Sequence, residues 1–171
     1  MAKSDSFFIR AKLSGLTGGA FDQTAIDMGA YVDALGKSVV RLSRVSVQYV
    51  FGDFGGPTVI APAPNEARIN WQLTTQSQGA LVDATDKSVI STGNLQATNT
   101  TAAANNYSFF AESTDINPED WTNGYLIGVE QIYLGGEATN FQFDADIIVV
   151  LECTVETLSQ SAAMALALSQ Q

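Results

Sequence analysis

The sequence predicts an all-β protein: a single jelly roll or β-sandwich of about eight antiparallel strands, followed by a short C-terminal helix. Most of the apolar segments alternate apolar and polar residues with a period of two, which is typical of half-buried strands. Only residues 159–171 change to an alanine- and leucine-rich pattern that favours a helix. The length of 171 residues fits one domain, 1–171, with an N-terminal arm at 1–6 and a helical tail at 159–171.

Each strand is predicted from its own run of alternating residues. In the first, Phe7, Ile9, Ala11 and Leu13 share one face. Residues 25–35 favour extended structure, with a short helix as the alternative. Glycine, proline and small polar residues predict loops at 14–19, 52–64 and 98–106. The expected strands cover residues 7–13, 38–51, 67–77, 88–91, 107–112, 125–134 and 144–158.

Three short segments depart from this alternation. Within residues 38–51 the apolar face changes parity near Ser43 and Arg44, which predicts a β-bulge or a bend between two sheets. Asn117 is followed by proline and two acids, which predicts one helical turn capped by that asparagine. The pair Gly135 and Gly136 is expected to begin the connection between the last two strands.

The charges are divided unevenly along the chain. All eight basic residues precede residue 88, whereas the formal net charge is −10 and residues 88–171 carry acids without any base. The charged fraction of 15% is well below the roughly 25% usual for soluble domains, which indicates a surface that is covered by association. The acidic half would repel polyanions, so direct binding of nucleic acid is not expected.

The chain contains no histidine, which excludes Ser-His-Asp and Cys-His catalysis. A glycosidase with paired carboxylates stays open as a remote alternative, but alternating acids more often mark solvated strand faces. We therefore do not expect an enzyme or a small-molecule substrate. The acids that could form such a pair are Glu130, Glu137, Asp144, Asp146 and Glu152.

No cofactor is expected. Loop aspartates could bind calcium, and an ion shared between subunits would be its most reasonable form, but such residues are more often turn formers and caps. The single cysteine, Cys153, lies in an apolar run and is interpreted as a buried structural thiol. The loop aspartates that could bind calcium are Asp83, Asp86, Asp115, Asp120 and Asp144.

The basic cluster in the first half of the chain consists of Arg10, Lys12, Lys37, Arg41 and Arg44. They are expected to pair with acids across strands or across subunits. The candidate subunit-interface charges are Arg10, Lys12, Arg41 and Arg44.

An alternative function, a carbohydrate-binding or adhesive module, would use exposed aromatic residues as a sugar platform; its candidates are Trp71, Trp121, Tyr107 and Tyr133.

No apolar run approaches the ~20 residues needed to span a bilayer. The residues before Phe7 lack the features of a secretory signal peptide, so synthesis in the cytoplasm without export is expected.

The strand order and size resemble the single jelly-roll capsid proteins of tail-less icosahedral viruses of bacteria and archaea that contain an internal membrane. The residues that carry the resemblance are the strand at 7–13, the bent strand at 38–51, the Trp71 strand, the turn at 117–121 and the final strand to Leu158. It implies a virion protein that assembles with its own copies or with a sister capsid protein. It also implies contact with an internal viral membrane and none with the genome.

Overall fold

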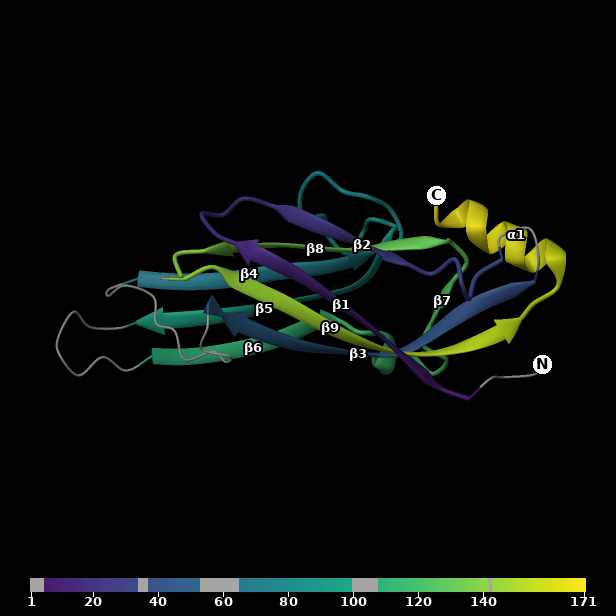
Figure 1. The fold of residues 1–171 in the computed structure, drawn as a ribbon, viewed down its shortest axis with the longest axis horizontal. Helices are drawn as coiled ribbons and strands as arrows, with labels where there is room; N and C mark the ends of the chain where they lie inside the picture. Colours follow the sequence, from purple (N-terminus) through teal and green to yellow (C-terminus); the bar gives the residue numbers. More distant parts are fainter. Residues whose placement is uncertain (1–4, 34–36, 53–64, 100–107, 142) are drawn as a thin grey trace.

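The computed structural model describes residues 5–33, 37–52, 65–99, 108–141 and 143–171. These residues form two antiparallel sheets with the strand orders β1-β9-β3-β7 and β2-β8-β4-β5-β6 (Figure 1). The elements are β1 (Phe7–Leu16), β2 (Asp22–Asp27), β3 (Ser38–Phe51), β4 (Asn65–Thr74), β5 (Val89–Asn99), β6 (Ser108–Ile116), a 3-10 turn (Pro118–Asp120), β7 (Tyr125–Ile127), β8 (Gln131–Thr139), β9 (Ala145–Thr157) and α1 (Gln160–Ser169).

The strand order is that of a jelly roll. Strands alternate between the two sheets along the chain, except that β4, β5 and β6 follow one another in the second sheet. Without β6, each sheet has four strands, as in the eight-stranded jelly roll. The predicted fold class is therefore confirmed, with β6 added at the edge of the five-stranded sheet.

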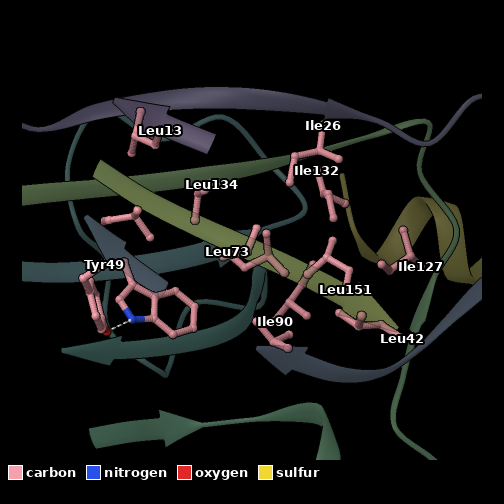
Figure 2. Packing of buried hydrophobic residues seen from close by; sticks show 14 of the residues in the cluster. Leu13, Ile26, Leu42, Tyr49, Leu73, Ile90, Ile127, Ile132, Leu134 and Leu151 are labelled. Carbon is pink, nitrogen blue, oxygen red and sulfur yellow. Dashed lines mark hydrogen bonds between the residues drawn. The ribbon is translucent and has the colours of Figure 1, made fainter. Parts of the chain in front are cut away.

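The core lies between the sheets and is made by the inward-facing residue of each alternating pair (Figure 2). Trp71 is the largest buried side chain, and its indole Nε1 donates a hydrogen bond to the hydroxyl of Tyr49 at 2.9 Å. Gly93 lies beneath the Trp71 ring, and a Cβ there would approach two ring atoms to 2.8 Å. A buried tryptophan therefore needs a residue without a side chain on the neighbouring strand.

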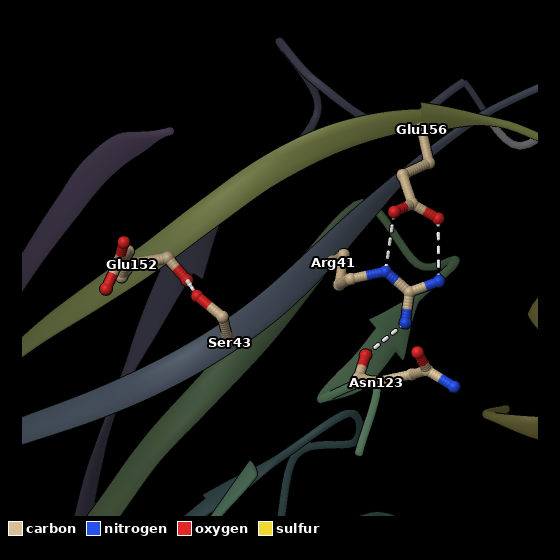
Figure 3. Close-up of polar contacts among 5 residues, drawn as sticks. All are labelled: Arg41, Ser43, Asn123, Glu152 and Glu156. Carbon is tan, nitrogen blue, oxygen red and sulfur yellow. Dashed lines mark hydrogen bonds and ion pairs between the residues drawn. The ribbon is translucent and has the colours of Figure 1, made fainter. Parts of the chain in front are cut away.

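The predicted change of face in β3 is a β-bulge. The pairing of β3 with β9 shifts between Leu42 and Arg44, which leaves Ser43 without a partner in the register. The Ser43 hydroxyl donates to the carbonyl of Glu152 at 3.0 Å (Figure 3). Because of the extra residue, Leu42 and Val45 both reach the core despite their opposite parity.

Three predicted boundaries were wrong. β1 continues to Leu16, which is buried, so the loop predicted at 14–19 begins only after Leu16. Residues 125–134 were expected to be one strand but form parts of β7 and β8, which lie in different sheets. Gly135 and Gly136 lie inside β8 and do not begin a connection. A Cβ at these two glycines would meet Phe21 at 2.6 Å and Ile147 at 2.7 Å, which explains glycine within a strand.

Other elements agree more closely with the predictions. Of residues 25–35, which were expected to be extended, only 25–27 belong to a strand, β2; residues 28–32 form a turn in which Tyr31 N and Val32 N donate to the Met28 carbonyl. β5 runs well beyond the predicted 88–91, and residues 53–64 and 100–106 of the predicted loops lie outside the described residues. The predicted turn near 117–121 is the 3-10 turn. The Asn117 side chain does not cap it and instead donates to Glu119 at 2.9 Å.

The predicted C-terminal helix is α1, which packs at the end of the sandwich beside β7 (Figure 1). Ser159 caps it by accepting a hydrogen bond from the backbone of Ala162. Gln170 then fixes its far end, because its buried side chain accepts from Gly128 N at 2.8 Å and donates to Leu126 O at 2.6 Å. Among the described residues, no helix has both the length and the apolar character required to cross a bilayer.

Candidate functional site

One surface collects most of the basic residues singled out in the sequence. On the four-stranded sheet, the side facing away from the core is formed by the alternate residues of three neighbouring strands. Phe8, Arg10 and Lys12 of β1 pair in register with β9, and Arg44, Ser46 and Gln48 of β3 pair with the same β9 residues from the other side. We call this surface the outer face; its β9 residues are Ile148, Val150 and Glu152.

The outer face combines an apolar centre with a basic border. Ile148 and Val150 are half-buried along the middle of the sheet, and Phe8 is 54% exposed beside them. The flanking strands place Arg10 and Arg44 on either side of this centre. The mixture of partly exposed apolar side chains and arginine is typical of protein–protein interfaces.

Two of the basic side chains on this surface have acidic partners within the chain. Lys12 Nζ lies 2.6 Å from Asp146 Oδ2, and Arg44 Nε lies 2.9 Å from Glu119 Oε2. Both cations stay more than half exposed, so these ion pairs contribute little to stability and can rearrange on association. Arg10 forms no ion pair with any described residue and lies opposite Val150.

Arg41 has a different environment from the other three candidate interface charges. Its guanidinium makes two hydrogen bonds to the carboxylate of Glu156, at 2.6 and 2.7 Å, and a third to the carbonyl of Asn123 (Figure 3). The Arg41 side chain is 17% exposed and that of Glu156 only 1%. Arg41 therefore joins β3, β9 and the segment before β7 within one molecule and is not available to a partner.

The five acids considered for a glycosidase are divided between the two sheets. Glu137 lies on β8 and Glu130 just before it, whereas Asp146 and Glu152 lie on β9 and Asp144 just before it. Burial alone would raise the pKa of Asp146, but hydrogen bonds from Lys12 and from the Gly15 amide hold it below its ordinary value. Asp146 is therefore ionised near neutral pH and unsuited to donate a proton.

Two of the aspartates considered for calcium act as turn formers, whereas Asp115 lies on strand β6 and accepts a hydrogen bond from Ser113. Asp83 accepts hydrogen bonds from Thr85, and Asp86 accepts them from the backbone and hydroxyl of Ser88. These bonds lower the pKa of both carboxyl groups. No cluster of three or more acidic, cysteine or histidine side chains suited to a metal ion occurs in the described part of the chain.

The aromatic residues considered for a sugar platform do not form one surface. Trp71 is buried in the core, and Tyr107 lies outside the described residues. Trp121 is 41% exposed and packs at a tilt against Tyr125, with 5.7 Å between the ring centroids. Tyr133 lies on β8, on the other sheet from β7.

The thiol of Cys153 and the hydroxyl of Tyr49 are both buried, which predicts a loss of stability at alkaline pH. Burial raises the pKa of the Cys153 thiol to about 12, and it also raises the pKa of the Tyr49 hydroxyl, despite the hydrogen bond from Trp71. In the unfolded chain these groups titrate near 8.5 and 10. Because the folded protein holds both protons more tightly, their stabilising contribution is complete below pH ~8.5 and is lost as the pH rises toward 12.

We therefore expect the free energy of unfolding to fall by up to about 1.4 kcal/mol per pH unit for each titrating group above pH ~9. Urea unfolding between pH 7.5 and 11 measures this. The Cys153→Ala variant should show a shallower decline between pH 9 and 10. A flat profile in the unmodified protein up to pH 11 would contradict the burial of both groups.

No protein-family model matches the chain, and the search of curated proteins found no match either.

Proposed function

We propose that this protein is a structural subunit of a virus capsid that assembles with its own copies or with a sister capsid protein. The observation that carries the proposal is the outer face, where an apolar centre and three exposed cations lie on one sheet of an otherwise acidic protein. The jelly-roll strand order also supports it, because virus capsids are among the main uses of this architecture.

Charge supplies the reason for association between copies. The chain has a net charge of −10, and the exposed acids of the five-stranded sheet include Asp22 and Asp27 on its edge strand β2. Opposite charges on two surfaces of one chain steer copies together and select their orientation. Association of one surface with a different surface repeats from copy to copy, as a shell requires.

Additional apolar surface supports association at a second place. Met164 and Leu168 are 45% and 69% exposed on α1, a helix without any charged residue. Contiguous exposed apolar side chains are uncommon on proteins that function as monomers. In the proposed virion these residues would be covered by a neighbouring component of the shell.

Replacing Arg10 with glutamate should weaken assembly by about tenfold or more, because it places a negative charge in the basic border of the outer face, beside the apolar centre. Arg10 has no ionic partner among the described residues, so the fold itself should keep its stability. Static light scattering across a protein concentration series, at about 0.05 and 0.5 M salt, measures the association.

Arg68→Glu is the matched control, because it makes the same charge change at an exposed strand position of the other sheet. If both variants weaken assembly equally, net charge alone is responsible and the outer face has no special role. An unmodified protein that stays monomeric at high concentration across the salt range would contradict the proposed function itself.

A further inference from the structure

We propose that a groove on the outside of the five-stranded sheet binds a neutral oligosaccharide. The groove has a volume of about 280 Å³ and lies between the outward side chains of β4 and β5 and the loop at 81–84 that follows β4. This volume is near the lower limit of the range of roughly 300–1,000 Å³ usual for small-molecule sites. It suits one unit of a longer chain that continues across the sheet.

The floor of the groove is part of a polar row that crosses four strands. The strand register places Glu137, Asn70, Asn94 and Ser113 side by side on β8, β4, β5 and β6. Asn70 Nδ2 donates to Glu137 at 3.2 Å, and Asn94 Nδ2 donates to Ser113 at 2.7 Å. These bonds orient both amides, so their carbonyl oxygens occupy defined positions at the surface.

The oriented groups have hydrogen-bonding capacity left for a ligand. Within the described part of the chain, no group donates to the side-chain oxygens of Asn70 and Asn94, and the Thr92 hydroxyl has no partner. All three side chains are half-buried beside one another in the groove. Sugar hydroxyls both donate and accept, and they match a floor of amides and a hydroxyl.

One wall of the groove is apolar and held firmly. Leu81 and Val82 form it, and the buried side chain of Gln72 fixes their position. Gln72 accepts a hydrogen bond from Val82 N at 2.8 Å and donates to the Ala80 carbonyl at 3.1 Å. A wall fixed in this way is already in place before a ligand binds, which lowers the entropic cost of binding. Its aliphatic side chains can pack against the C–H groups of a sugar ring.

The charges around the groove select for a neutral ligand. Asp83 and Asp115 both line it, and hydrogen bonds from Thr85 lower the pKa of Asp83, so that this carboxylate is ionised near neutral pH. Carboxylates repel phosphates, sulfates and acidic sugars, whereas they accept hydrogen bonds strongly from neutral hydroxyls. The groove therefore favours uncharged sugars over anionic ones.

This site differs from an aromatic platform. Trp71 contributes to the groove only from behind the floor, because its ring points into the core. The groove also lies on the opposite sheet from the outer face. Binding of sugar should therefore persist in the Arg10→Glu variant, where assembly is weakened.

The test begins with an array of neutral and acidic oligosaccharides, followed by titration calorimetry with the neutral sugar that binds best. Thr92→Val removes one hydroxyl from the floor without changing its shape, and should weaken binding about two- to tenfold. Thr98→Val is the matched control, because it makes the same change further along β5 and outside the groove. Asn94→Ala should weaken binding at least as strongly as Thr92→Val.

Binding of neutral sugars that is weakened by Thr92→Val and unchanged by Thr98→Val supports the site. The proposal is overturned if no neutral sugar binds, if acidic sugars bind better, or if Thr92→Val binds as the unmodified protein does. Loss of binding in Trp121→Ala together with normal binding in Thr92→Val would move the site to the exposed aromatic pair and also overturn it.

Discussion

Replacing Arg41 with methionine is expected to lower the free energy of unfolding by about 3–5 kcal/mol, the cost of removing one partner of a buried ion pair. The loss arises because Glu156 would remain almost fully buried without its two hydrogen bonds from the guanidinium. The Asn123 carbonyl would lose its donor as well, which loosens the segment before β7.

Chemical denaturation of Arg41→Met beside Arg44→Met measures the effect. The second variant breaks an ion pair between two well-exposed side chains, so its stability should be close to that of the unmodified protein. The double variant Arg41→Met/Glu156→Leu should recover much of the loss, because it leaves no unpaired buried charge. Equal destabilisation by Arg41→Met and Arg44→Met would contradict a structural role for Arg41.

Gly124→Ala is expected to lower the free energy of unfolding by about 2–4 kcal/mol, through a strained backbone and an overlap of atoms. Gly124 has a φ of 62°, a conformation that residues with a side chain rarely adopt. A Cβ at this position would overlap the Leu42 carbonyl oxygen, which belongs to the backbone of β3 and cannot rotate away.

Gly79→Ala is the matched control, because a Cβ there meets no atom within 4 Å and the backbone is not left-handed. Its effect should stay within about 0.5 kcal/mol. Thermal and urea unfolding of both variants gives the comparison. Normal stability of Gly124→Ala would mean that β7 can move away from β3 at little cost.

The sequence pattern predicted those parts of the fold that depend on a local period. In β1, β3 and β9 the inward face is more buried than the outward one, so alternation reveals both the strand and its inward side. The bulge at Ser43 was predictable for the same reason, because a change of parity is visible along the chain. The predicted Asn117 cap was wrong: its Nδ2 donates to Glu119, and its Oδ1, the atom that would cap the turn, accepts no hydrogen bond from a described residue.

The features that escaped prediction depend on strands distant in sequence. Gly135 and Gly136 suggest a turn locally, but the space that they leave is filled by Phe21 and Ile147. Three of the four candidate interface charges lie beside acids, whereas Arg10 forms no ion pair with a described residue, and only the structure separates Arg41 from the others. Arg41 differs because the carboxylate of Glu156, on strand β9, binds its guanidinium within the molecule.

The sugar groove could not have been found from the sequence. Asn70 and Asn94 lie far apart in the chain, and nothing in their spacing marks them as neighbours on one surface. The sequence indicates aromatic residues as the candidates for binding sugar, but one of them, Trp71, is buried. A row of polar residues on the open side of adjacent strands is a signal that emerges only from the register.

The position of β9 between β1 and β3 also sets the order of events during synthesis. The first strand pairs only with residues 145–153, so it waits for nearly the whole chain before it enters a sheet. Pairings of such long range form slowly, and β9 leaves the ribosome after the other strands of the two sheets. The outer face therefore cannot exist before β9 has been made, and in the proposed assembly copies would recognise one another only after β9 has paired with β1 and β3.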